Sequence, residues 1–172
     1  AKTYAQRFGL AIDMPAGPSE VLVLADDLAR PDFVAADLLS QAEHGPDSQV
    51  VLVTTSRTLQ NEVKNELNRQ IRLLKRSEIA AEALKKSMSL WFPTMDTALS
   101  FANAYAPEHL IMQVDEAEVW ASRVQNAGSV FIGPYTPESA GDYASGTNHT
   151  LPTGGWAKTY SGVSVASFQK TV

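Results

Sequence analysis

Each histidine of this 172-residue chain lies close in the sequence to a carboxylate or an amide side chain. The groups are Gln41-Ala42-Glu43-His44, Pro107-Glu108-His109 and the run from Asp142 to His149. Imidazole nitrogens and carboxylate or amide oxygens bind metal ions, and imidazoles and carboxylates also exchange protons in catalysis. Since the chain contains no cysteine, a metal site would need nitrogen and oxygen ligands. The pattern therefore indicates a metal site or an acid/base site.

Gln41 and His44 lie three residues apart on a predicted helix, so both side chains project from one face near its C-terminal end. This spacing brings an amide oxygen and an imidazole nitrogen within reach of one ion. Asp142 lies in a glycine-containing run, where the backbone can approach a ligand closely, and it adds a hard anionic oxygen. Taken singly these features are weak, because a hydrogen-bonded surface pair and a solvated turn have the same patterns.

Glu108 and His109 stand where a predicted helix ends and a predicted strand begins, with Pro107 restricting the turn. The two side chains titrate in different ranges when unperturbed, near about 4 and about 6.5. One of them could take a proton from a hydroxyl group while the other activates water. The dipeptide alone is not specific for catalysis.

The composition is that of an ordinary globular domain, with 44% hydrophobic and 19% charged residues. A net charge of −5 argues against a nucleic-acid or anionic-membrane partner, since phosphate groups bind to basic surfaces. We find no signal-peptide pattern and no apolar run of about 20 residues, so we expect a cytoplasmic protein. The chain also lacks the glycine-rich motifs that cradle the phosphates of dinucleotides and nucleoside triphosphates.

Apolar runs alternate with helical patterns between residues 20 and 133. Strands are predicted at 21–25, 50–54, 89–92, 109–114 and 128–133, with helices at 31–42, 57–74, 77–86, 96–104 and 116–125. This order predicts an α/β fold with a mainly parallel sheet flanked by helices, an incomplete Rossmann-like three-layer α/β/α arrangement. We expect one α/β domain over residues 1–155, followed by a C-terminal strand and extension over 156–172, with the strand at 161–168.

The predicted order of elements also predicts where the polar groups meet. We expect Gln41, His44 and Asp142 to converge near the carboxyl ends of the strands, where open α/β sheets usually bind ligands, with Glu108 and His109 bordering the same cleft.

Longer stretches of the sequence resemble the histidinol dehydrogenases. The stretches are Gly17-Pro18-Ser19-Glu20, Gln41-Ala42-Glu43-His44, Ala106-Pro107-Glu108-His109-Leu110, Gly128-Ser129-Val130-Phe131, the run from Gly141 to His149, and Leu151-Pro152-Thr153-Gly154. They occur in the family's order over essentially the whole chain. The glycine-containing run from Gly141 is the most specific of them.

The resemblance implies a zinc- and NAD-dependent oxidation of L-histidinol, through histidinaldehyde, to L-histidine. It implies that zinc is held by Gln41, His44 and Asp142, which also contact the substrate. It further implies substrate contacts from Ser19 and His109, proton transfer by Glu108 and His109, and a supporting role for His149. The residues that contact NAD are not identified by it.

The resemblance also implies a homodimer in which the partner subunit supplies a further zinc-binding histidine from a C-terminal tail. No histidine follows His149, and the family's N-terminal part has no counterpart in the chain. We therefore expect this polypeptide to match only part of the enzyme and to be inactive alone. Two alternatives remain open: an NAD-dependent dehydrogenase of another polar alcohol, and a metal-binding domain without catalytic activity.

Overall fold

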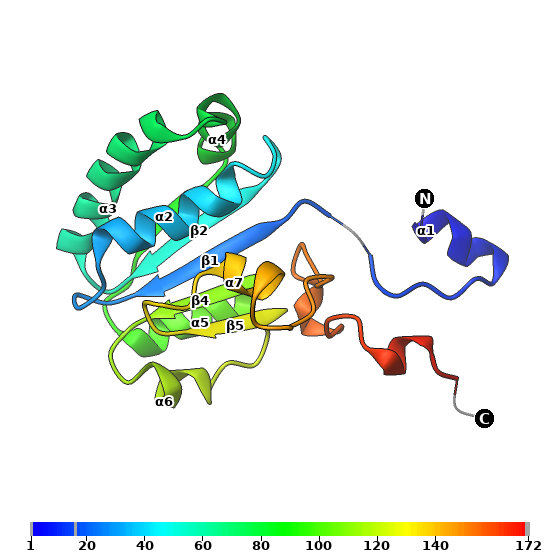
Figure 1. Cartoon of the computed structure of the whole chain (residues 1–172). Helices are drawn as coiled ribbons and strands as arrows, with labels where there is room; N and C mark the ends of the chain where they lie inside the picture. The colour runs from blue at the N-terminus through cyan, green and yellow to red at the C-terminus, as the bar shows by residue number, and fades with distance from the viewer. Residues whose placement is uncertain (1, 16, 171–172) are drawn as a thin grey trace.

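A sheet of five parallel strands forms the centre of the molecule (Figure 1). The computed structural model describes residues 2–15 and 17–170. The strands are β1 (Glu20–Ala25), β2 (Gln49–Thr54), β3 (Met88–Trp91), β4 (His109–Gln113) and β5 (Ser129–Ile132), in the spatial order β3-β2-β1-β4-β5. Every neighbouring pair is parallel. The predicted α/β fold with a parallel sheet flanked by helices is confirmed.

The helices that follow the strands cover both faces of the sheet. The α-helices are α1 (Lys2–Ala5), α2 (Pro31–Ala42), α3 (Arg57–Gln70), α4 (Ser77–Leu84), α5 (Met95–Tyr105), α6 (Ala117–Ala121) and α7 (Glu138–Tyr143). Short 3-10 helices lie at Gln6–Phe8, Ile71–Leu73, Trp156–Lys158 and Val165–Phe168. In Figure 1, α1 and the final segment both project away from the layers of the sheet.

The central place of β1 in the sheet explains why its residues 21–25 are all apolar. Val21, Val23 and Ala25 face one core, which is completed by α2, α3 and α4. Leu22 and Leu24 face a second core, formed mainly with α5 and its neighbours. Because both faces are covered, all six residues of β1 are buried, as expected of a central parallel strand.

Side-chain caps begin two of the covering helices. The Ser56 hydroxyl accepts the backbone N–H of Leu59 at the start of α3, and the Thr94 hydroxyl accepts that of Thr97 at the start of α5. Helix α2 begins instead with Pro31, whose fixed backbone angle suits a first helical turn. No helix among the described residues is both long and apolar enough to cross a membrane.

The strand predicted at 161–168 is wrong. Ser164 adopts an extended conformation, but residues 165–168 close into a 3-10 helix in which the Ser164 N–H is satisfied by the Ser167 hydroxyl at 3.1 Å. A local serine turn therefore competes successfully with strand pairing for these backbone groups. Of the predicted 156–172 extension, residues 171 and 172 lie outside the described residues.

Candidate active site

The polar groups meet at the amino ends of the strands. Ser19 precedes β1, Glu20 is its first residue, and His109 is the first residue of β4. Helix α2 returns from the carboxyl end of β1, so its last turn, with Gln41, also lies at the amino edge. The predicted location at the carboxyl ends is therefore wrong. The reason is geometric, because the C-terminus of a crossover helix must lie where the next parallel strand begins.

The peptide groups of Glu20 hold both members of the Glu108–His109 pair. Its backbone N–H donates to Glu108 Oε2 at 3.0 Å. Its carbonyl oxygen lies 3.2 Å from His109 Nδ1. A carbonyl oxygen can only accept, so Nδ1 carries the hydrogen and Nε2 is left with the lone pair in the neutral ring. The geometry therefore assigns Nε2 as the basic nitrogen of His109.

The side chain of Glu20 ties further segments to this point. Its Oε1 accepts the Gly154 N–H at 3.1 Å, and its Oε2 accepts the Tyr105 hydroxyl at 3.3 Å. Burial raises the pKa of the Glu20 carboxyl, and these hydrogen bonds oppose the rise. Through these hydrogen bonds Glu20 of β1 connects α5 and the segment after α7 to the strand end that holds the Glu108–His109 pair.

Glu108 is a buried carboxyl group. Burial raises its pKa to about 7, and the nearby carboxylates of Glu20 and Glu138 add to this effect. The Glu20 N–H and the Ser19 hydroxyl act in the opposite direction by hydrogen bonding to the carboxylate. A carboxyl group with a pKa near neutrality exists in both protonation states at physiological pH, which suits a group that takes and returns protons.

The raised pKa of Glu108 predicts a pH-dependent effect of the Glu108→Gln substitution on stability. As pH rises from the ordinary value of 4.5 to about 7, the unfolded chain releases this proton before the folded chain does. The ionised carboxylate therefore destabilises the native state above this window. We expect Glu108→Gln to gain about 1–2 kcal/mol relative to the parent between pH 4.5 and pH 8.

Urea unfolding at pH 4.5 and pH 8 measures this difference. Glu62→Gln, at an exposed position on α3, is the matched control and should show no such gain. An equal effect of Glu108→Gln at both pH values would contradict the burial of an ionisable Glu108.

A tight turn and a close backbone contact place Glu108. Ala106 ends α5 in the left-handed conformation, with φ of 58°, and is fully buried. Such a conformation is uncommon for a residue other than glycine. On the other side, a Cβ added at Gly128 would lie 2.5 Å from the carbonyl oxygen of Glu108. A glycine is needed there because the backbones of β4 and β5 approach so closely.

Helix α7 brings carboxylates to the other side of His109. Glu138 Oε1 lies 4.0 Å from His109 Nε2. Burial lowers the pKa of His109, while the charges of Glu138 and Asp142 raise it and that of His44 lowers it further. These effects require Asp142 and His44 to lie within electrostatic range of His109. The described contacts join Glu108, His109 and Glu138, and the charges of His44 and Asp142 act on the same histidine.

The Gln41 side chain has features that are typical of a ligand-binding group. Its side chain is fully buried, and within the described part of the chain neither amide atom has a hydrogen-bond partner. Leaving a buried amide unpaired costs about 1–3 kcal/mol, so such groups are rare without a functional reason. Among residues 2–15 and 17–170, no group of three or more His, Asp or Glu side chains is arranged to hold a metal ion. A zinc set of Gln41, His44 and Asp142 contains only two residues of those types.

Of the remaining expected site residues, Ser19 lies at the site and His149 does not. Ser19 is half-buried and reaches the Glu108 carboxylate. His149 is exposed, and no hydrogen bond or ion pair among the described residues joins it to the cluster. The structure thus brings Ser19 to the site and does not bring His149 there.

Sequence reasoning missed Glu20 and Glu138 as members of the site. Glu20 is the last residue of the Gly17–Glu20 stretch quoted above, so a signal was present there. Glu138 lies four residues before Asp142, the spacing of neighbours on one helix face, but no helix is predicted from the sequence after residue 125. The short helix α7 is what turns both carboxylates towards the sheet.

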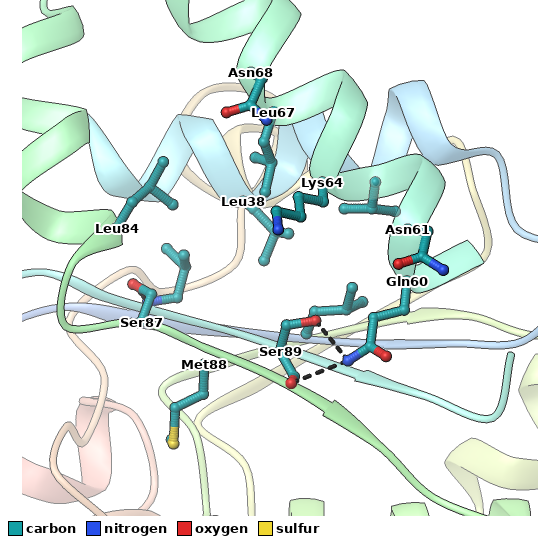
Figure 2. Close-up of a pocket in the computed structure, with 13 residues that line it drawn as sticks. Leu38, Gln60, Asn61, Lys64, Leu67, Asn68, Leu84, Ser87, Met88 and Ser89 are labelled. Carbon is teal, nitrogen blue, oxygen red and sulfur yellow. Dashed lines mark hydrogen bonds between the residues drawn. The ribbon is translucent and has the colours of Figure 1, made fainter. Parts of the chain in front are cut away.

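A separate groove of about 510 Å³ lies between α3, α4 and the β2–β3 edge of the sheet (Figure 2). Gln60 spans part of it, where its amide donates to the carbonyl and hydroxyl oxygens of Ser89 at 3.1 and 3.0 Å. Its described lining is apolar and amide-rich, with Lys64 as its charged residue. Without a carboxylate or a histidine, the groove does not compete with the amino-edge cluster as an acid/base site.

Comparison with known proteins identifies the family of the chain. A family model described as "Histidinol dehydrogenase" matches residues 1–172. The chain belongs to the histidinol dehydrogenase family. The family resemblance noted in the motifs is therefore confirmed over the whole sequence.

Individual members of the histidinol dehydrogenase family are similar at high identity. The histidinol dehydrogenase of Bacteroides thetaiotaomicron is 64% identical over 163 residues, which are 95% of this chain and 38% of that protein. The chloroplastic histidinol dehydrogenase of Arabidopsis thaliana is 59% identical over 162 residues, which are 94% of this chain and 35% of that protein. The crystal structure of histidinol dehydrogenase from Elizabethkingia anophelis matches with a TM-score of 0.94 at 54% identity, over 96% of this chain and 38% of that one. The chain thus spans little more than a third of these relatives.

Proposed function

We propose that this chain carries the acid/base and zinc-binding residues of an enzyme that oxidises L-histidinol through histidinaldehyde to L-histidine. Membership of the histidinol dehydrogenase family over all 172 residues, together with the Glu108–His109 pair buried at one point, supports the proposal. Ser19 and His109 would contact the substrate, because Ser19 lies next to the Glu108 carboxylate and His109 lies near the Glu138 carboxylate.

Gln41, His44 and Asp142 would hold a zinc ion. The fit rests on the buried, unpartnered Gln41 amide and on a donor set of one amide oxygen, one imidazole and one carboxylate, which zinc accepts. Bound zinc would act as a Lewis acid that orients the substrate, and bound NAD would accept a hydride in each oxidation. A histidine from a partner subunit would complete the ligand set, as the family resemblance implies.

The chain's own residues would move the protons. His109 Nε2 would take the hydroxyl proton of the alcohol, since Nδ1 is already committed to the Glu20 carbonyl. Glu108 would take a proton from the water that adds to the aldehyde, and a pKa of about 7 leaves enough carboxylate for this at neutral pH. Burial of both groups limits competing bulk water around the reacting atoms.

The test is an assay of the full-length protein that contains this sequence. With zinc and NAD, formation of NADH should be fast with L-histidinol and slow with small diols or other amino alcohols. Better turnover of another polar alcohol would overturn the substrate assignment. The isolated 172-residue chain is expected to show no turnover, because hydride transfer needs the nicotinamide held in near-attack contact and the chain has no phosphate-cradling motif.

A further inference from the structure

Glu138 is a buried carboxylate that the mechanism above does not use. It is 3% exposed and is the first residue of α7. Its Oε2 accepts the Ser40 hydroxyl at 3.3 Å, and its Oε1 faces His109 Nε2 at 4.0 Å. Among the described residues no lysine or arginine pairs with the Glu138 carboxylate, and its ion-pair partner is His109. A buried carboxylate that no lysine or arginine neutralises is costly, which indicates that this arrangement serves the histidine.

The distance between Oε1 and Nε2 has a chemical meaning. At 4.0 Å the two atoms are too far apart for a hydrogen bond, so Glu138 does not occupy the Nε2 lone pair. They are close enough for a strong charge interaction, because opposite charges within about 4–6 Å favour the ionised forms. The carboxylate repels the lone pair of the neutral ring and attracts the ring once Nε2 is protonated.

We propose that Glu138 is a positioning residue for His109, whose carboxylate stabilises the ring when Nε2 holds the proton taken from the substrate hydroxyl. The O–H bond of the substrate breaks, the proton moves to Nε2, and the hydrogen on Nδ1 stays hydrogen-bonded to the Glu20 carbonyl oxygen. Glu138 and the Glu20 carbonyl then hold opposite sides of one imidazolium ring. This role rests on the histidinol dehydrogenase function proposed above.

Other groups also surround His109 and Glu138. The charged or titratable groups that act on His109 are Glu108 just before its strand, Glu138 and Asp142 on α7, and His44 after α2, whereas Glu20 contacts the ring through its backbone carbonyl. Behind Glu138 lies Asp37, whose pKa is raised to about 6 by burial and by the Glu138 charge, and whose carboxylate accepts the Gln113 amide at 2.7 Å. The single hydrogen of the Ser40 hydroxyl is shared between Glu138 Oε2 and the Asp37 carbonyl oxygen, which is the nearer acceptor at 2.8 Å. Glu138 is therefore contacted by Ser40 of α2 at Oε2, and its Oε1 lies on the side of His109.

Histidine NMR tests this role without any need for turnover. The chain has three histidines, so ¹⁵N-histidine labelling gives few signals, and a chelator keeps the sample free of metal. In the parent chain we expect His109 to be the tautomer with hydrogen on Nδ1. Glu138→Gln should lower the His109 titration midpoint by about one pH unit or more, while the His149 midpoint stays unchanged. An unchanged His109 midpoint would overturn the proposal.

A kinetic measurement separates positioning from a structural role. In the full-length enzyme, Glu138→Gln should lower kcat about tenfold, with KM for histidinol little changed, since one pKa unit of lost proton affinity corresponds to a factor of ten. Glu138→Asp, which keeps the charge, should recover part of the loss. An unchanged kcat, or a rise in KM alone, would overturn the proposal.

One further variant, and the independence of the NMR result from turnover, keep the proposal testable. If Glu138→Gln does not fold, Ser40→Ala takes its place, because it removes only the hydroxyl that holds Oε2 and should lower the His109 midpoint by a smaller amount in the same direction. If the parent enzyme does not oxidise histidinol, the proposed function fails while the NMR result still decides whether Glu138 acts on His109.

Discussion

His109→Asn is expected to slow both oxidation steps of the full-length enzyme by about 10²–10⁴-fold, the usual effect of losing a general base. An asparagine amide can still donate to the Glu20 carbonyl, as His109 Nδ1 does at 3.2 Å, so the local fold should survive. It has no basic nitrogen in place of Nε2, so no group remains to take the hydroxyl proton. Stopped-flow measurement of NADH formation from histidinol and from histidinaldehyde gives the two rates separately.

Glu108→Gln is the matched comparison for this prediction. It keeps the size of the side chain and an oxygen that can accept the Glu20 N–H, but it cannot take a proton from water. We expect it to damage aldehyde oxidation far more than alcohol oxidation. The rate of aldehyde oxidation by the parent enzyme should increase as pH rises through about 7, where Glu108 ionises. This increase of the rate with pH should be absent in the variant. Equal losses in both steps for Glu108→Gln would remove its role in water activation.

The fold was predictable because a few strong signals agree. The apolar run of β1 requires cover on both faces, and the cap at Ser56 and the proline at Pro31 mark where two of the covering helices begin. Once strands and helices alternate in this way, parallel pairing with right-handed crossovers leaves few arrangements. The final segment was not predictable on this basis. Val163 and Val165 favour a strand, but the local serine hydrogen bond decides the outcome.

The members of the site were easier to predict than its location. Polar types and spacing single out Glu108, His109, Gln41 and His44, because the chain has only three histidines and these two lie next to or near a carboxylate or an amide. The general preference of α/β sheets for ligands at the carboxyl ends pointed to the wrong edge. A single fact about α2 corrects it, since the last turn of a crossover helix lies beside the first residues of the strands. That fact was available from the predicted order of elements.

Glu138 and Glu20 show what a sequence does not reveal. A glutamate in a glycine- and proline-rich run has the sequence pattern of a solvated turn, yet Glu138 is 3% exposed. Its burial depends on α7 packing against α2, a contact between segments almost a hundred residues apart. The hydrogen bonds of the Glu20 peptide likewise follow from the register in which Val21 pairs with His109. Both are properties of tertiary structure.

The second large effect is expected at Gln41, where stability and zinc binding should change in opposite directions. Gln41→Met replaces a buried amide that has no partner among the described residues with an apolar side chain of similar length. The metal-free chain should therefore gain about 1–3 kcal/mol of stability, the cost of an unpaired buried amide. The same change removes a proposed zinc ligand, and a lost ligand weakens chelation strongly.

Gln41→Glu makes the prediction specific to a ligand role. It keeps an oxygen donor at the same place and adds a negative charge, so the metal-free chain should be less stable at neutral pH, whereas stabilisation by zinc should be retained or increased. Thermal unfolding of the parent and both variants, across a zinc titration up to millimolar concentrations, measures both quantities, because a ligand that binds only the folded state raises its stability with concentration. Binding by the chain alone should be weak, since the proposed set has only Gln41, His44 and Asp142. If Gln41→Met responds to zinc as the parent does, Gln41 is a core residue and the zinc set must be sought elsewhere. The opposite outcome is that Gln41→Met is the more stable of the two variants without zinc and Gln41→Glu is the more stable with zinc. In that case the unpaired amide of Gln41 is kept, at a cost in stability, because it binds the metal.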